Sequence, residues 1–264
     1  MKRLRALTVR PRVGGGTRDR GRSGIWLTAF LVAILSAVAL PARAQPGFDS
    51  IVAQFEEVAF GSEHGNRISV VRKWTENPGL ALFKLPDYDI TPYIESIGRH
   101  LQVLSDLTGI SVSLADAPSE ATLRLGFYPR AEFVNMPGSS DDPEFVRWVS
   151  TSACIALAVS DRDNRGSIAA GAIAIGTDIP ESQREHCILE ELIQVMGLPN
   201  DACHYRPSLF CEDDRVFELT AADEILLRTL YDARLVAGTP KEAAMPVVRR
   251  IVAELMEEQI AQAH

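Results

Sequence analysis

The sequence predicts an α+β fold. Segments with the alternating or uninterrupted apolar pattern of β-strands lie among segments whose apolar residues recur at the three- and four-residue steps of amphipathic helices. Strand and helix segments are mixed along the chain, and two helical segments follow residue 218. This order of elements indicates an α+β domain.

The first 44 residues have the layout of a cleaved secretory signal peptide. A basic stretch precedes an apolar run over residues 25–40, and Ala42-Arg43-Ala44 follows as a small-x-small cleavage signal. The alternative is a retained single-span anchor, for which the apolar run is barely long enough. We expect cleavage after Ala44, a periplasmic or secreted location, and no stable membrane insertion after cleavage.

Cleavage would leave an acidic chain of about 220 residues, a length that suits one domain. The first 44 residues hold nine Lys and Arg and one Asp, so 18 basic and 34 acidic residues remain and the net charge is about −16. Such a surface repels phosphates, so we expect no nucleic acid partner. We divide this part into an N-terminal extension at residues 45–66, a main domain at residues 67–238 and a C-terminal helix at residues 239–264.

Helix and strand patterns are mixed in the elements before residue 130. Residues 45–66 are polar except for one apolar patch that fits a short helix. Residues 67–74 have strand character, and residues 81–85 continue it after an Asn-Pro-Gly turn. Thr91-Pro92 predicts a helix start, with the helix ending at Gly109. Residues 121–128 alternate like another strand.

A hairpin is predicted after a loop at residues 135–145. Its strands cover residues 154–160 and 167–176. The second strand has unusually small side chains, which let another group approach the backbone closely. We favour tight packing beneath a helix over a bound ligand as the reason.

Three helices complete the predicted fold. Ser182 and Glu185 form an S-x-x-E capping signature at the start of the first helix, which ends at Gly197. A loop follows to about residue 218, and Thr220 is the predicted N-cap of the second helix. The last helix is amphipathic from Pro246 to about residue 261.

Four cysteines follow the leader, an even number that fits two disulfides in an exported protein. Cys203 and Cys211 are close in sequence across a proline-containing loop, so we favour that pair, which leaves Cys154 with Cys187. Sequence alone allows three pairings. A free Cys187 within a site is the competing interpretation.

The helix from Ser182 to Gly197 is the main candidate for a functional site. Its apolar residues fill one arc of a helical wheel, and that arc must face the core. The opposite arc is either solvated or the floor of a cleft. This polar arc contains Gln183, His186, Cys187, Glu190, Glu191 and Gln194.

The stretch from Glu190 to Asn200 has the spacing of the zinc-protease motif HExxHxxGxxH, but all three histidines are absent. Glu190, Gln194 and Asn200 stand at the ligand positions, and Glu191 stands where a glutamate would activate zinc-bound water. Carboxamides are weak zinc ligands. We therefore expect no metal and no other cofactor here.

Residues downstream of this stretch resemble the matrixin-like metzincins in order and spacing. Gly197-Leu198 matches the end of the motif, and Leu209 or Phe210 stands where those proteins have the methionine of the Met-turn. The final helix of that family is matched by Leu219, Thr220, Asp223, Leu230 and Tyr231. The resemblance implies a zincin-like domain with a mixed sheet, an active-site-type helix and C-terminal helices.

A closer resemblance is to a bacterial family of exported proteins known as domain of unknown function 2927. It covers about residues 60–240 and rests on three passages: RKWT (72–75), EELIQVMGLPND (190–201) and LTAADEILLRTLYD (219–232). This resemblance implies the fold and export rather than an activity.

These resemblances and the missing histidines imply an exported pseudo-peptidase, which binds a peptide or envelope component without cleaving it. Gln194 and Asn200 keep hydrogen-bonding groups that suit peptide backbone recognition. The predicted binding residues are Glu190, Gln194, Asn200, Asp201 and His186.

Two alternatives stay open. One is an active metal-dependent hydrolase or peptidase that holds zinc or another divalent cation with His186, Glu190 and Asp201, with Glu191 as the catalytic base. The other is a purely structural envelope protein.

Overall fold

The computed structural model describes residues 47–63, 67–211 and 213–262, and Ala44–His264 form one compact unit. The predicted signal peptide, residues 1–44, lies outside the described residues. Within the described ranges, no helix has the length and apolar character needed to cross a membrane. Helices and strands are mixed along the chain, which confirms the α+β prediction.

The helices are α1 (Phe48–Phe60), α2 (Thr91–Thr108), α3 (Pro143–Thr151), α4 (Glu181–Gln194), α5 (Ala221–Tyr231) and α6 (Lys241–Gln262), with the 3-10 turns η1 (Pro118–Glu120) and η2 (Arg130–Asn135). The strands are β1 (Gly79–Lys84), β2 (Ser113–Leu114), β3 (Leu123–Tyr128), β4 (Cys154–Ser160) and β5 (Ile168–Gly176).

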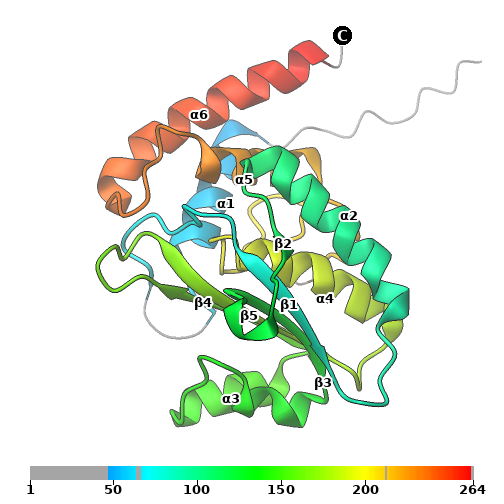
Figure 1. Ribbon diagram of the computed structural model, residues 1–264. Coiled ribbons are helices and arrows are strands. Elements are labelled where there is room, and N and C mark those ends of the chain that lie inside the picture. The colour runs from blue at the N-terminus through cyan, green and yellow to red at the C-terminus, as the bar shows by residue number, and fades with distance from the viewer. Residues whose placement is uncertain (1–46, 64–66, 212, 263–264) are drawn as a thin grey trace, which may run out of the picture. The chain divides into compact units, whose positions relative to one another are not determined.

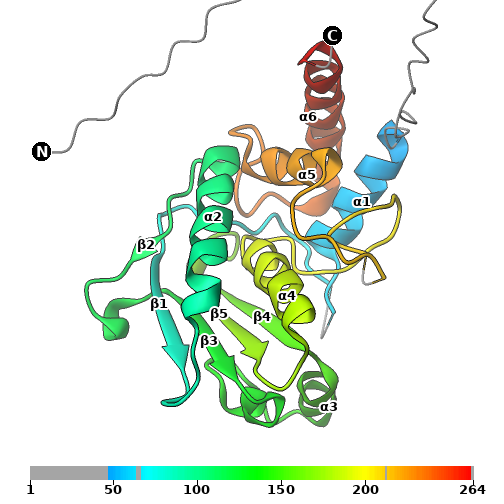
Figure 2. The ribbon, with the colours of Figure 1, turned by 90° about the vertical axis from the view of Figure 1, so that its right-hand side faces the viewer.

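The five strands form one mixed sheet in the order β2-β1-β3-β5-β4. Strand β1 is parallel to β2 and β3, and β3 is parallel to β5. The edge strand β4 is antiparallel to β5, as the predicted hairpin requires. Helices α2 and α4 lie on one face of the sheet, and α3 lies on the other (Figures 1 and 2).

Strand β5 separates two apolar cores because successive side chains of a strand point to opposite faces. Ile173 and Ile175 belong to the main core, which includes α4. Ala172 and Ala174 belong to a smaller cluster that includes Phe145 of α3. Burial on both faces explains the uninterrupted apolar sequence of this strand.

The small side chains of β5 permit close packing against the residues that end α4. A Cβ atom added at Gly171 would lie 2.5 Å from Cγ2 of Val195 and 3.4 Å from Cζ2 of Trp74. The indole Nε1 of Trp74 donates a hydrogen bond to the Val195 carbonyl oxygen at 3.0 Å. Packing, rather than a ligand, therefore accounts for the small residue at this position.

The predicted strand at residues 67–74 is wrong. In this segment Val70 makes an isolated bridge to Pro240, and Lys73 makes one to Ser167. The two partners belong to different segments of the chain, so the two bridges do not extend into one continuous ladder. The apolar pattern reflects burial of separate side chains instead of strand pairing.

The predicted loop at residues 135–145 overlaps the start of α3, which begins at Pro143. Asp142 is its N-cap, and the Asp142 carboxylate accepts hydrogen bonds from the backbone N–H groups of Glu144 and Phe145. An acidic N-cap followed by proline is a strong helix start. The helix was missed because the preceding Gly-Ser-Ser-Asp run reads as a loop.

Two other helix starts differ from the prediction. Helix α4 begins at Glu181 after Pro180, with no side-chain cap, so the S-x-x-E signature does not form a capping box. Helix α6 begins at Lys241, and the predicted start, Pro246, lies inside it. The Pro240 carbonyl accepts from the Ala244 N–H at 2.9 Å, so the first turn closes before Pro246 is reached.

The predicted N-cap at Thr220 is confirmed. Its hydroxyl accepts from the Asp223 backbone N–H, and the Asp223 carboxylate accepts from the Thr220 N–H, which completes a capping box. The predicted end of α2 at Gly109 is also confirmed, because this residue adopts the left-handed conformation with φ 73°. Both signals are local, so they are readable in sequence.

Helices α1 and α6, from opposite ends of the described chain, pack against each other and contribute to the main core. Phe55 and Phe60 of α1 are fully buried. The Lys241 ammonium lies 2.6 Å from the Glu56 carboxylate, which adds an ion pair at the contact.

Candidate functional site

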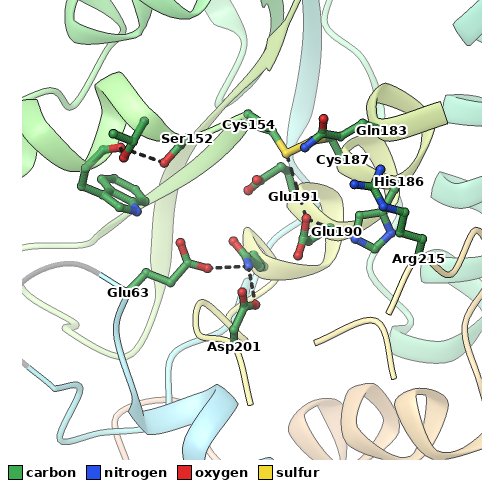
Figure 3. Close-up of a pocket in the computed structure, with 14 residues that line it drawn as sticks. Glu63, Ser152, Cys154, Gln183, His186, Cys187, Glu190, Glu191, Asp201 and Arg215 are labelled. Carbon is green, nitrogen blue, oxygen red and sulfur yellow. Dashed lines mark hydrogen bonds and ion pairs between the residues drawn. A yellow bond between two sulfur atoms is a disulfide. The ribbon is translucent and has the colours of Figure 1, made fainter. Parts of the chain in front are cut away.

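A pocket of about 500 Å³ lies along the polar arc of α4 (Figure 3). Its other walls come from residues 148–154, at the end of α3 and the start of β4, and from the loop that follows α4. The lining residues are Glu63, Trp148, Thr151, Ser152, Ala153, Cys154, Gln183, His186, Cys187, Glu190, Glu191, Gln194, Asp201 and Arg215.

The polar arc of α4 is therefore the floor of a cleft, which resolves the choice left open by the sequence. His186, Glu191 and Gln194 are all buried, with Glu191 only 3% exposed. The apolar arc, including Ile188 and Leu192, is buried in the main core as expected. A solvated helix face would leave these polar side chains exposed.

Both predicted disulfides are present. Cys154 pairs with Cys187, and Cys203 pairs with Cys211, which leaves no free cysteine among the four of the chain. The first bond joins the start of β4 to α4 at the pocket wall, so Cys187 is a bridging residue and not a free thiol. Two disulfides are compatible with an extracytoplasmic location.

Glu191 is the most unusual group in the pocket. Its Oε2 atom is buried and accepts no hydrogen bond from any described group. Burial raises the pKa of Glu191 well above its ordinary value of 4.5, and the neighbouring carboxylates of Glu190, Glu63 and Asp201 raise it further. Its side chain points away from Glu190 into the space toward Ser152 (Figure 3).

Gln194 ties two acidic residues together. Its amide Nε2 donates to the Glu63 carboxylate at 2.8 Å and to the Asp201 carboxylate at 3.3 Å (Figure 3). Four of the fourteen lining residues are therefore acidic, and an amide bridge joins two of them. The basic lining residues are Arg215 and His186.

Asn200, predicted to bind a ligand, is not among the residues that line the pocket. Its amide donates to the Glu57 carboxylate at 3.3 Å and to the Asp201 carbonyl oxygen at 2.9 Å. The Asn200 side chain thus serves the fold of the loop after α4. The other predicted binding residues, Glu190, Gln194, Asp201 and His186, lie together in the pocket.

His186 lies at the end of the pocket nearest the Cys154–Cys187 bond (Figure 3). Its Nδ1 atom is 2.7 Å from the Val216 carbonyl oxygen, and its Nε2 atom is 3.6 Å from Oε2 of Glu190. A carbonyl oxygen can only accept, so Nδ1 carries a proton. This contact fixes the ring with Nε2 toward the Glu190 carboxylate.

The residues at the positions of zinc ligands do not fit a zinc protease. Gln194 and Asn200 present carboxamides, and Asn200 lies outside the pocket lining. The alternative ligand set of His186, Glu190 and Asp201 is not brought together either. Among the described residues, the three-residue group of metal-binding type that converges within 4.8 Å consists of Cys154, Cys187 and Glu190.

The segment that the metzincin resemblance predicts at the Met-turn position is part of the core. Leu209 and Phe210 are fully buried. The Asp223 carboxylate accepts hydrogen bonds from the Ser208 hydroxyl at 2.8 Å and from the Leu209 backbone N–H at 3.2 Å. The same carboxylate that caps α5 therefore also fixes this segment.

A family model described as "Protein of unknown function (DUF2927)" matches residues 49–250. The chain belongs to this family. No curated protein matches the chain. The match confirms the family resemblance drawn from the three sequence passages. The region that matches DUF2927 extends from α1 into α6.

Several lining residues of this DUF2927 protein were not predicted, notably Glu63 and Arg215. Glu63 accepts a hydrogen bond from the Gln194 amide, yet it lies 131 residues before Gln194 in the sequence. No periodicity or motif joins residues so far apart, so a single sequence carries no signal for them. Trp148 is more accessible to sequence reasoning, because a tryptophan on an amphipathic helix can line a groove as well as pack in a core.

Proposed function

We propose that this DUF2927 protein is exported and acts as a non-catalytic, zincin-like binding protein, whose pocket holds a cationic group of a peptide or envelope component. The observation that carries the proposal is the buried Glu191 oxygen that lacks a donor. A buried acceptor without a donor costs about 1–3 kcal/mol. An ammonium or guanidinium group would supply donors and balance the charge of the surrounding carboxylates.

The charge of the pocket supports a cation rather than an anion. Three carboxylates line the same pocket as Glu191 and raise the pKa of Glu191: those of Glu63, Glu190 and Asp201. A cation that enters this space would favour ionised Glu191 and lower its pKa again. Ligand binding and proton release are therefore coupled in this proposal.

The donor set supports a binding role over hydrolysis. Gln194 donates its amide N–H groups to Glu63 and Asp201 and so holds the pocket together. Its remaining polar atom is a neutral carboxamide oxygen, which is a weak ligand for zinc. No group of three ligands forms from His186, Glu190 and Asp201. Glu191 then has no metal-bound water to activate in this arrangement.

The order of elements supports a zincin-like scaffold. Helix α4 carries the motif-like stretch and gives way to Gly197, which has φ 116° and lies against the backbone of Arg72. The buried segment at Leu209 and the capping box of α5 follow in the same order as in the metzincin resemblance.

Export is supported by the sequence of the leader and by the two disulfides. Expression of the full chain in a bacterial host and N-terminal sequencing of the periplasmic fraction would test it. We expect a mature protein that begins after Ala44. A chain that retains the apolar run and sediments with membranes would instead support the anchor.

The binding role is testable with a matched pair of probes. One is a fluorescein-labelled pentapeptide with a central lysine, and the other is the same peptide with that lysine acetylated. We expect the lysine peptide to bind at least about tenfold more tightly, because a hydrogen bond to a charged group contributes about 1.5–3 kcal/mol. Glu191→Gln should remove this preference, and Glu257→Gln, on the exposed side of α6, should keep it.

The same assay separates the alternatives. Equal binding of both peptides would contradict a cation-binding pocket. Cleavage of the peptide that Glu191→Gln abolishes would support the metal-dependent hydrolase. If neither peptide binds and neither is cleaved, a structural envelope protein is the better description.

A further inference from the structure

The Cys154–Cys187 disulfide lies beside two other groups that bind metals. The two sulfur atoms and a carboxylate oxygen of Glu190 all lie within 4.8 Å of one another. The distance from Cys154 Sγ to Glu190 Oε2 is 4.0 Å, and His186 Nε2 is 3.6 Å from the same oxygen. Thiolate, imidazole and carboxylate are the ligands that Zn²⁺ prefers.

Two of the separations are close to those of a tetrahedral site. With bond lengths near 2.0–2.3 Å, ligand atoms around tetrahedral zinc lie about 3.3–3.8 Å apart. The oxygen–nitrogen distance of 3.6 Å falls in this range, and the sulfur–oxygen distance of 4.0 Å is close to it. The two sulfurs would reach it through side-chain rotation, because they leave bonding contact.

The histidine is already oriented as a ligand would be. Its Nδ1 donates to the Val216 carbonyl oxygen at 2.7 Å, and this contact aims Nε2 at Glu190. A backbone carbonyl on the far nitrogen is a common way to fix the tautomer and ring of a metal-binding histidine. In neutral His186 the Nε2 lone pair faces a carboxylate, an arrangement that a cation between them would stabilise.

We propose that reduction of the Cys154–Cys187 disulfide creates a site for Zn²⁺ or another thiophilic divalent cation, with Cys154, Cys187 and Glu190 as its converging ligands. His186 lies outside that 4.8 Å group but contacts Glu190, and it would complete the site after a side-chain movement. The inference goes beyond the proposed peptide-binding role and does not depend on it. The Cys203–Cys211 bond is an internal comparison, since no described third ligand joins it in a converging group.

The chemistry requires a dithiol reductant, such as the reduced form of a thiol–disulfide oxidoreductase. One thiolate of the reductant attacks Cys154 Sγ, which lines the pocket, and releases the Cys187 thiolate. The second thiolate of the reductant then displaces Cys154, so the reductant leaves as a disulfide and two electrons pass to the protein. The two cysteine thiolates take up the two protons that the dithiol gave up, and the cation displaces these protons when it binds both sulfurs.

Oxidised and metal-bound forms would thus both join α4 to β4 at the same point, whereas the reduced, metal-free form would not. The site would therefore couple the redox state of the surroundings, and the supply of metal, to the link between α4 and β4.

The test uses the full chain with Cys203→Ser and Cys211→Ser, so that only the two pocket cysteines can become thiols. After reduction by a thiol-free phosphine under anaerobic conditions, Co²⁺ is added as a spectroscopic substitute for Zn²⁺. We expect thiolate-to-cobalt charge-transfer absorption that saturates at one equivalent, and its displacement by Zn²⁺. Oxidised protein should show neither.

Two matched variants complete the experiment. Glu190→Gln should weaken the cobalt affinity of the reduced protein by about tenfold or more. A variant with Cys154→Ser and Cys187→Ser, which keeps the other cysteine pair, should give no charge-transfer band. If reduction unfolds the chain, added Zn²⁺ should restore the far-ultraviolet circular dichroism of the oxidised form.

Three results would overturn the proposal. They are the absence of stoichiometric binding by the reduced protein, an affinity that Glu190→Gln leaves unchanged, and a reduced, unfolded chain that Zn²⁺ fails to refold.

Discussion

Replacing Glu191 by glutamine isolates the cost of keeping an ionisable group in the pocket floor. The substitution keeps the size of the side chain and removes its negative charge. Folding raises the pKa of Glu191 above 4.5, through burial first and then through Glu190, Glu63 and Asp201. The carboxyl group is therefore more easily ionised in the unfolded chain than in the folded one.

The sign of the pH dependence follows from this difference. Between the unfolded and folded pKa values, the unfolded chain has lost the proton and the folded chain keeps it. The free energy of unfolding therefore falls as the pH rises from about 4.5 toward the folded pKa, by at most about 1.4 kcal/mol per pH unit. The glutamine variant lacks this term.

We expect thermal unfolding to show little difference between Glu191→Gln and wild type at pH 4. At pH 8 the variant should be more stable, by up to about 1.4 kcal/mol for each pH unit between 4.5 and the folded pKa, because it has no proton to lose on unfolding. For a chain of this size, each kcal/mol raises Tm by about 2–4 °C. Calorimetry at several pH values gives both the difference and its slope.

The control is Glu257→Gln, which removes the same charge from an exposed position on α6. Its stability difference from wild type should be near zero and independent of pH. The reasoning is refuted if Glu191→Gln is no more stable than wild type at pH 8, or if its effect is equal at both pH values.

Three other substitutions and one control test the fold around the site by denaturant unfolding. Gly171→Val should cost about 1–3 kcal/mol because the new side chain would meet Val195. The control Gly98→Ala, on the exposed face of α2 with open space around it, should stabilise by up to about 1 kcal/mol. Equal effects would contradict the packing of β5. Asp223→Asn should cost about 1.5–3 kcal/mol, because the carboxylate accepts from the α5 cap and from the buried segment before it. Trp74→Phe should cost about 1–2 kcal/mol through the lost Nε1 hydrogen bond, and an unchanged midpoint would show that this bond contributes nothing.

Signals that act over a few residues were predicted well from the sequence. The cap at Thr220 and the stop at Gly109 depend on the residue itself and its near neighbours. The eight-residue separation of Cys203 and Cys211 favours that pair and leaves Cys154 with Cys187, and both bonds are present. The buried face of α4 was likewise predictable, because the helical period of its apolar residues is visible in the sequence.

Features that depend on distant partners were not predictable. The segment at residues 67–74 has strand-like composition, but its neighbours in space, Pro240 and Ser167, offer single bridges and no ladder. Glu63 enters the pocket from the segment after α1. The burial of Glu191 likewise depends on tertiary packing, since residues 148–154 form another wall of its pocket.

The packing of α1 against α6 has a consequence for the order of folding. The Asp49 carboxylate pairs with the Arg249 guanidinium at 2.9 Å, across 200 residues of chain. Contacts of such long range form late, because a large loop must close before they contribute any stability. The hydrophobic face of α1 therefore waits for nearly the whole polypeptide to emerge, and during that interval it is the surface that a holding chaperone would recognise.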